Sequence, residues 1–416
     1  MFEIYIWTIA FISLYVSIFW IIVSSLSKNK QKPQPLKIYP KISIGVPVWN
    51  EEKTVIRSIK SLLELEYPKD KLEIIAVNDG STDKTKTIVE EYIRKNKLKN
   101  VILISQENRG KAGALNTALR HAGGEYFGVF DADSIASKEA LKLMLPYFQT
   151  EENVAAVISP IKVYDPKNVV EKIQRIEYIF TSFVRKLMSD VGTLHITHGV
   201  LSIFRKDIIE KIGGFDEKIN RNLTEDLEIA LRLKKNHYQI VLSEENVNYT
   251  RVPDKAKILW FQRVRWFRGF MVNNISYKDM ILNKRYGLLG RFQMPLEILT
   301  LGIVFTSLGF LTYQLVKRLY FLIIKLSILK WEIFDYIKIP TLKQFILDLN
   351  IKILFPVVVS LIAGLYLYTM AHRYTKEKWS FHLVSFIYLF LYPIFRSIQW
   401  VHALLLELFQ AGRKWR

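Results

Sequence analysis

The chain has 416 residues, 50% of them hydrophobic and 13% aromatic, with a formal net charge of +20 and no cysteine. With a mean hydropathy of +0.12, this composition indicates membrane segments. The lack of cysteine excludes disulfides and cysteine-ligated metals and fits a reducing compartment. Basic residues are spread out and no nucleic-acid motif occurs. We therefore attribute the charge to anionic lipid or a polyanionic substrate and expect no nucleic-acid partner.

The first apolar stretch, residues 4–26, carries no charge and is long enough to cross a hydrocarbon core of ~30 Å. No acid lies among the five lysines that follow, which are Lys28, Lys30, Lys32, Lys37 and Lys41. Positive charge stays on the cytoplasmic side, so we expect the N-terminus outside and the next segment inside. A cleaved signal peptide would need a basic start and a clear cleavage site, so residues 1–27 are predicted to be a membrane anchor.

Composition and hydropathy divide the remaining chain into four predicted regions. They are a Lys/Pro linker (28–40), a cytoplasmic catalytic domain (41–252), interfacial helices (253–285) and C-terminal transmembrane and interfacial helices (286–416). The last region holds apolar stretches at 298–316, 353–371 and 380–395. Residues 317–352 between them are mixed, and either an interfacial helix or a further span fits. Three later spans would put the basic tail at 412–416 outside, against the positive-inside rule, so either 317–350 holds another span or 397–409 lies along the inner surface. We leave the number of spans and the side of the C-terminus open.

The catalytic region alternates between strand and helix patterns. Strands are predicted at 41–50, 72–83, 100–107 and 125–133, with helices at 53–65, 84–95 and 111–122. This order implies an α/β fold with a parallel sheet covered on both faces. Ligands of such sheets bind beyond the carboxyl ends of the strands, which is where candidate site residues are sought.

Acidic residues follow three of these strands. They are Glu51 after the first, Asp79 after the second, and Asp131 with Asp133 after the fourth. Each alone fits a turn or a helix cap. Together at one sheet edge they predict a site for a hard divalent cation, which takes one or two carboxylates plus substrate phosphates. Lys111 stands at the start of a helix, where phosphate is favoured, although an ordinary solvated lysine is the alternative.

Two later segments complete the candidate set. Asn222–Glu228 starts a predicted helix that Thr224 is suited to cap, with Glu225 and Asp226 favourable to the helix dipole. The alternative is that a carboxylate at this helix start faces the crevice as a general base, and the pattern alone does not choose between them. Residues 260–270 read WFQRVRWFRGF, which fits an aromatic belt at the lipid headgroups as well as part of an active site. The absence of G-x-G-x-x-G and of G-x-x-x-x-G-K-[ST] argues against a nicotinamide cofactor and a P-loop.

Five motifs occur in an order that we recognise: NDGSTD (78–83), NRGKAGALN (108–116), DAD (131–133), TED (224–226) and Q-x-x-R-W (262–266). The set resembles the inverting family 2 glycosyltransferases of the processive membrane type, which include cellulose, hyaluronan, chitin and poly-N-acetylglucosamine synthases. The resemblance covers residues 41 to about 275. It implies an A-type nucleotide-diphospho-sugar transferase domain with a mixed, mostly parallel sheet, and transmembrane helices beside it.

The resemblance also implies roles for individual residues. Asp226 is the expected base, grouped with Glu225 and Arg265 as catalytic. Asp133 is expected to bind Mg²⁺ or Mn²⁺, with Asp131 beside it and near the nucleotide. Glu51 and Asp79 are expected to contact the nucleoside, and Lys111 and Arg265 the phosphates. Trp266 is expected to contact the acceptor sugar and Gln262 to form a hydrogen bond nearby. Residues 197–206 resemble the loop that lines the acceptor path, with Gly199 at a close approach.

The function implied is transfer of a sugar from a nucleotide diphosphate sugar to a growing polysaccharide by a multi-pass cell-membrane enzyme. UDP-N-acetylglucosamine is the first choice of donor and UDP-glucose the second, and a helper subunit is a possible partner. Two alternatives stay open: a non-processive transferase that adds a sugar to a lipid, and a catalytically silent membrane protein that binds nucleotide sugar or polysaccharide.

Overall fold

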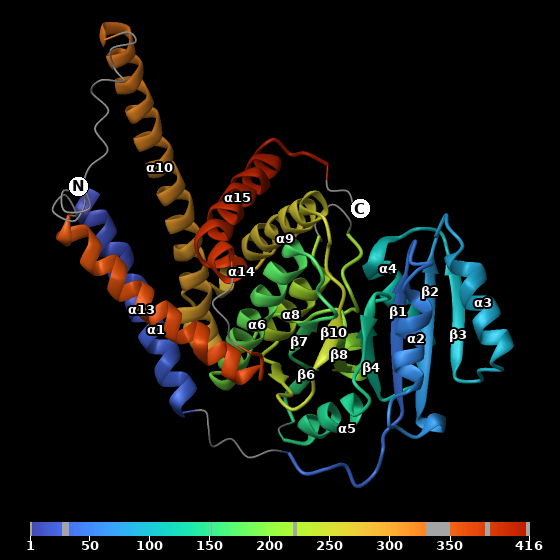
Figure 1. Ribbon diagram of the computed structural model, residues 1–416. Helices are drawn as coiled ribbons and strands as arrows, with labels where there is room; N and C mark the ends of the chain where they lie inside the picture. Colours follow the sequence, from blue (N-terminus) through green and yellow to red (C-terminus); the bar gives the residue numbers. More distant parts are fainter. Residues whose placement is uncertain are drawn as a thin grey trace. The chain divides into compact units, whose positions relative to one another are not determined.

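The structure is a computed structural model that describes residues 2–26, 33–150, 152–218, 223–329, 350–378 and 383–412 (Figure 1). The chain forms two compact units, Met1–Leu26 with Leu296–Met370, and Ser27–Pro295 with Ala371–Arg416. The predicted C-terminal region 286–416 is therefore shared between both units. Lys28, Lys30 and Lys32, the basic tail at 413–416 and residues 330–349 of the undecided segment lie outside the described residues.

The larger unit is built on a seven-stranded sheet in the order β3-β2-β1-β4-β8-β6-β9. Neighbours run parallel except at β8, which is antiparallel to both β4 and β6. The expected mixed, mostly parallel sheet is thus confirmed. The strands are β1 (Ile42–Val48), β2 (Leu72–Asp79), β3 (Val101–Gln106), β4 (Tyr126–Phe130), β6 (Val154–Ile158), β8 (Val200–Arg205) and β9 (Gln239–Leu242).

The first four strands are nearly continuous apolar runs because helices cover the sheet. All five residues of β4 are buried, and Ile44 and Ile74 on β1 and β2 have no exposed surface. The helices between these strands are α2 (Val55–Leu63), α3 (Thr85–Lys95) and α4 (Gly110–His121), close to the ranges that the apolar spacing predicts. Burial of these faces fixes where each strand ends, and with it the position of the polar residues that follow.

Residues after the DAD motif form a second sheet in the order β5-β10-β7, made of β5 (Ser134–Ile135), β10 (Asn248–Thr250) and β7 (Ile161–Val163). The remaining elements of this unit up to residue 293 are η2 (Lys69–Lys71), α5 (Ala140–Met144), η3 (Leu145–Gln149), α6 (Val169–Asp190), α7 (Lys206–Lys211), α8 (Glu225–Lys235), α9 (Ala256–Ser276) and the short turns η4 (Lys278–Met280), η5 (Lys284–Tyr286) and η6 (Leu289–Gln293). A capping box of Asn168 and Glu171 starts α6.

Four described helical segments are long and apolar enough to cross a membrane: Glu3–Leu26, Leu289–Ile328, Ile351–Tyr374 and Leu383–Leu408. They contain α1 (Phe2–Leu26), α10 (Met294–Leu329), α13 (Ile351–Tyr374), and α14 (Leu383–Phe386) with η8 (Ile387–Leu391) and α15 (Tyr392–Leu408). The undecided segment 317–352 therefore begins as a continuation of α10. At ~1.5 Å per residue, the 36 residues of α10 exceed the length that a bilayer requires.

The last of these segments belongs to the larger unit, where α15 packs along α9 (Figure 1). Gln399 and Ala403 of α15 are buried, whereas Ile394, Ile398 and Leu405 are exposed. The helix therefore has one face that packs on the rest of the larger unit and another whose apolar side chains are exposed.

Candidate active site

The end of β2 is tied to the start of α4 through Asp79. This side chain is only 3% exposed, and its Oδ1 accepts hydrogen bonds from Gln106 Nε2 at 2.7 Å and from the Arg109 backbone N–H at 2.9 Å. Asn108 Nδ2 donates to the Asp79 carbonyl at 2.9 Å. The carboxylate is therefore held in one orientation at the carboxyl end of the sheet, as the sequence predicts for its position.

Glu51 lies at the neighbouring strand end. Its backbone N–H donates to Thr85 Oγ1 at 2.8 Å, and its carboxylate accepts from the Thr54 hydroxyl. Burial raises the pKa of the Glu51 carboxyl, and the nearby carboxylates of Asp131 and Asp83 raise it further. Because β1 and β4 pair in parallel, their carboxyl ends lie side by side, with Glu51 after one and Asp131 after the other.

Lys111 joins two of the predicted motifs. Its Nζ lies 2.6 Å from Asp131 Oδ1 and 2.8 Å from Glu225 Oε1, and its side chain is 14% exposed. Burial alone would lower the pKa of this ammonium, but the carboxylates of Asp131 and Glu225 raise it well above its ordinary value. Lys111 is thus a permanent positive charge at the start of α4, and the interpretation as an ordinary solvated lysine is wrong.

Gly199 makes room for the first carboxylate of the DAD motif. A Cβ on this residue would lie 1.9 Å from Asp131 Oδ2, and the Gly199 carbonyl accepts from the Asp131 backbone N–H at 2.7 Å. The close approach that the sequence predicts for Gly199 is therefore to Asp131.

Asp133 is the second carboxylate of the motif. Burial raises its pKa to about 7, and Asp131 and Glu51 raise it in the same direction. Within the described ranges, no group of three or more His, Asp or Glu side chains could hold a metal ion. Carboxylates that crowd one another fit a divalent cation that takes its remaining ligands from substrate phosphates and water.

The TED motif begins α8 and carries the expected base. Asp226 Oδ1 accepts from the Leu227 backbone N–H at 2.9 Å, and the Asp226 carbonyl accepts from Thr197 Oγ1 at 2.8 Å. Burial raises the pKa of the Asp226 carboxyl to about 6, and Glu225 adds to the shift. Burial would also raise the pKa of Glu225, but Lys111 lowers it. The two adjacent carboxyls thus have different proton affinities, as acid–base pairs in enzymes do.

Thr224 connects the TED motif to α9 instead of capping α8. Its Oγ1 accepts from Asn273 Nδ2 at 3.0 Å, and no capping hydrogen bond from its side chain is formed. A Cβ on Gly269 would lie 2.4 Å from Thr224 Oγ1. Gly269 therefore allows α9 to approach the base helix closely.

The Q-x-x-R-W motif lies on α9. Arg265 Nη1 donates to the Leu223 carbonyl at 3.3 Å, and burial lowers the pKa of its guanidinium while Glu225, Asp226 and Asp131 oppose that shift. Arg265 therefore contacts the residue that precedes the TED motif, and its charge interacts with the TED and DAD carboxylates. The roles of Gln262 and Trp266 in the site stay predictions.

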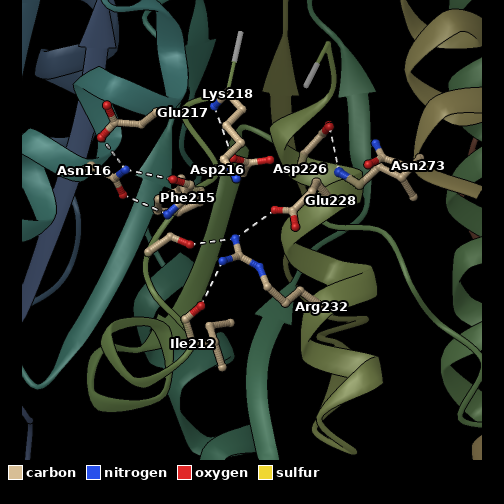
Figure 2. A network of polar contacts seen from close by, with 12 residues as sticks. Asn116, Ile212, Phe215, Asp216, Glu217, Lys218, Asp226, Glu228, Arg232 and Asn273 are labelled. Carbon is tan, nitrogen blue, oxygen red and sulfur yellow. Dashed lines mark hydrogen bonds and ion pairs between the residues drawn. The ribbon is translucent and has the colours of Figure 1, made fainter. Parts of the chain in front are cut away.

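A polar network connects α8 to the segment 212–217 and to α4 (Figure 2). Asn116 binds the Phe215 backbone through both its amide atoms at 2.8 Å and donates to Glu217 Oε1 at 2.7 Å. Arg232 of α8 donates to the Ile212 and Gly214 carbonyls and to Glu228 Oε2 at 2.7–2.8 Å. The network walls a hollow of about 570 Å³ and links the helix that carries Lys111 to the helix that carries Asp226.

The structure adds residues that the motifs did not single out. Gln106 orients Asp79, and Arg263, which lies inside Q-x-x-R-W, contacts Gln262 and Trp266. Arg185 of α6 is close enough to Asp226 for the two charges to interact, and burial lowers the pKa of its guanidinium. Gln106 lies in a predicted strand and Arg263 inside a quoted motif, but neither carried a signal of its own, and no element was predicted around Arg185.

A family model for "Glycosyl transferase family 2" matches residues 43–213. The chain therefore carries a family 2 glycosyltransferase domain, and it is an enzyme of the glycosyltransferase class. It is 32% identical over 241 residues to the probable glycosyltransferase YdaM of Bacillus subtilis, which covers 56% of either chain. It is 29% identical over 338 residues to a poly-β-1,6-N-acetyl-D-glucosamine synthase of Staphylococcus epidermidis, which covers 78% of either chain.

A solved structure shares the fold. It is the mannosyltransferase PcManGT from Pyrobaculum calidifontis in complex with GDP-mannose and Mn²⁺, which matches 99% of this chain and 100% of its own with a TM-score of 0.66 at 19% identity. The expected A-type nucleotide-sugar transferase fold is confirmed. With its four candidate spans, the chain is a membrane glycosyltransferase.

Proposed function

We propose that this glycosyltransferase moves a sugar from a nucleotide diphosphate sugar to a growing polysaccharide with inversion at the anomeric carbon. UDP-N-acetylglucosamine is the first choice of donor, since the synthase from Staphylococcus epidermidis is similar over 78% of the chain, and UDP-glucose is the second. The observation that carries the proposal is the position of Lys111 Nζ, 2.6 Å from Asp131 and 2.8 Å from Glu225. It joins the phosphate, metal and base motifs in one cluster.

In the proposed reaction Asp226 takes the proton of an acceptor hydroxyl, whose oxygen attacks the anomeric carbon. The bond from that carbon to the diphosphate oxygen breaks, and the nucleotide diphosphate leaves with the electron pair. Burial raises the pKa of Asp226 to about 6, which is close to neutral and suits a general base. Lys111 and Arg265 are fixed positive charges that stabilise the leaving group as its charge develops.

Asp133 and Asp131 are the residues that would hold Mg²⁺ or Mn²⁺. When bound, the ion supplies Lewis-acid charge at the diphosphate. Asp79 and Glu51 are proposed to contact the nucleoside, Trp266 to offer its ring face to the acceptor sugar, and Gln262 to form a hydrogen bond nearby. Gly199 keeps the acceptor side of Asp131 free of a side chain.

The same proposal places the enzyme in the cell membrane as a multi-pass protein with its catalytic unit in the cytoplasm. It rests on the apolar helices and on Lys37 and Lys41, which follow the first of them. Polymer synthesis is favoured over a single transfer to a lipid by the extent of similarity to the Staphylococcus synthase. A helper subunit is compatible with this arrangement.

The test is nucleotide release by detergent-purified protein with a panel of UDP- and GDP-sugars, with and without Mn²⁺, followed by sizing of the product. We expect metal-dependent release with a UDP-sugar and products of several sugars. Products that carry one sugar on a lipid, even with native lipid extract and excess donor, would contradict polymer synthesis. Release that leaves only free sugar would contradict transfer.

A further inference from the structure

A single buried carboxylate gathers three helices behind the Q-x-x-R-W motif. Glu177 of α6 accepts from Arg263 Nη2 of α9 at 2.7 Å and from the Tyr392 hydroxyl of α15 at 3.0 Å. Its other oxygen lies 3.2 Å from Arg396 Nη1 of α15. We call Glu177, Arg263, Tyr392 and Arg396 the Glu177 cluster. Its members are far apart in sequence, so only the fold brings them together.

The cluster reaches the proposed acceptor site through Arg263, whose residue has no exposed surface. The Arg263 guanidinium carbon lies 4.1 Å from the centre of the Trp266 ring, and Nη1 donates to Gln262 Oε1 at 2.6 Å. One guanidinium therefore contacts two of the three side chains that define the motif. A planar cation against an aromatic face restricts the tilt of the ring, which a lysine ammonium would not do.

Charge keeps this arrangement together. Burial alone would raise the pKa of Glu177 and lower that of Arg263, but each partner shifts the other in the opposite direction, so that both stay ionised. A buried charge whose partner is removed is left without compensation, and neighbouring groups then rearrange. The cluster is consequently sensitive to the loss of Glu177 or Arg263, whose charged side chains are both buried.

Helix α15 adds contacts along the same side of α9. The ring of Trp400 stacks on Phe267 with the ring centres 4.0 Å apart and the planes at 8°. Arg268 Nε lies 2.5 Å from Glu407 Oε1, and Trp260 Nε1 donates to His402 Nδ1 at 2.9 Å. The opposite side of α9 contacts the TED motif through Gly269 and Asn273. The helix that carries Trp266 is therefore held between the base helix and the C-terminal helix.

We infer that Glu177 is a positioning residue for sugar transfer, which fixes the Trp266 ring through Arg263, and that α15 completes this arrangement from outside the matched family domain. The inference rests on the proposed function, in which Trp266 contacts the acceptor sugar. In this inference the acceptor side of the site depends on contacts with residues 392–396. The nucleotide side depends instead on α4 and the strand ends.

The test compares three variants of the full chain in detergent. Glu177→Gln removes the charge, Tyr392→Phe removes one hydrogen bond from the same carboxylate, and Arg175→Gln is the control. Arg175 lies on the same helix and pairs with Glu377, so its loss breaks another contact between α6 and the C-terminal segment without touching α9. Nucleotide affinity is measured by calorimetry and transfer by titration of an oligosaccharide acceptor.

Glu177→Gln is expected to raise the KM for acceptor about tenfold, because Arg263 loses its charged partner and no longer holds the Trp266 ring. Tyr392→Phe is expected to raise it about threefold, because it removes one hydrogen bond from the same carboxylate. Nucleotide affinity and the Arg175→Gln variant should stay near the wild type. An unchanged acceptor KM in Glu177→Gln would overturn the inference. So would an equal loss of nucleotide affinity, because that result indicates general destabilisation.

A second readout does not depend on activity. The protein is labelled with 5-fluorotryptophan, and the fluorine resonance of Trp266 is assigned with Trp266→Phe. The resonance should move in Glu177→Gln and stay in Arg175→Gln, and an unmoved resonance in Glu177→Gln would refute the contact. If the wild type transfers no sugar from any donor, the proposed function fails while this resonance still tests the Glu177 cluster.

Discussion

The two halves of the candidate site are built in different ways. The first half uses strand ends and the start of α4, and its central residue Asp79 is held by Gln106 and Arg109, all within 31 residues of chain. The second half places the TED motif against α9, whose other side contacts α15 more than 120 residues further on. The proposed nucleotide side is therefore built locally by the sheet, whereas the proposed acceptor side depends on distant segments.

Among the substitutions that probe this comparison, the largest effect is expected at Arg265, whose charge interacts with carboxylates of both halves. Arg265→Lys should lower transfer by about 100-fold, because a point charge cannot replace the planar fork that binds diphosphate oxygens in pairs. Release of nucleotide from the chosen donor measures this loss. Activity within a few-fold of the wild type would mean that Arg265 acts only through long-range charge.

Asp79→Ala tests whether the first half can be weakened without an effect on the second. Loss of this carboxylate frees Gln106 and the Arg109 N–H, so nucleotide affinity should fall by about 30-fold, in line with the strength of hydrogen bonds to charged groups. Calorimetry with UDP measures the change. The acceptor KM of this variant at saturating donor should stay close to the wild type, and a comparable rise in that KM would contradict the separation.

Gly269→Ala tests whether the second half can be weakened without an effect on the first. The new Cβ would lie 2.4 Å from Thr224 Oγ1 and push α9 from the base helix, so we expect about tenfold less transfer with nucleotide binding retained. Gly302→Ala is the matched control, since it adds the same methyl to a helix with no atom within 4 Å. An alanine normally favours a helix, so equal behaviour of both variants would show that the close approach is unimportant.

The smallest effect is the pH dependence. As a base, Asp226 must be deprotonated, and its pKa is raised to about 6 by burial and Glu225, against Lys111 and Arg265, with the charge of Arg185 also nearby. The kcat/KM should therefore be about half its plateau near pH 6 and fall further below it. A profile that stays flat down to pH 5 would assign the proton transfer to another group.

The sequence predicted the first half well. The spacing of apolar residues and the apolar runs located β1 to β4 and the helices between them. Because the strands are parallel, Glu51, Asp79 and Asp133 follow strand ends at one edge of the sheet. The same reasoning did not reach Gln106, because a polar residue at the end of a half-buried strand has no distinguishing pattern. The alternation of strand and helix patterns was likewise enough to predict the α/β fold class.

The second half could be predicted only as motifs. Resemblance drew attention to Asp226, Arg265 and Trp266, but no local pattern indicates that Glu177 pairs with Arg263, 86 residues away, or with Tyr392, 215 residues away. Hydropathy alone also treats residues 383–408 as a membrane span, although their polar side chains Gln399 and Arg396 face the catalytic unit. Long-range packing decides these features.

The central claim is that Asp226 is the base that activates the acceptor. The most direct measurement is transfer and UDP binding by Asp226→Asn, which keeps size and shape but cannot take the proton. We predict that transfer falls by at least ~100-fold while UDP affinity stays within a factor of about two. Equal activity in the variant would contradict the assignment of the base, and loss of UDP binding with activity would show that the carboxylate serves the donor instead.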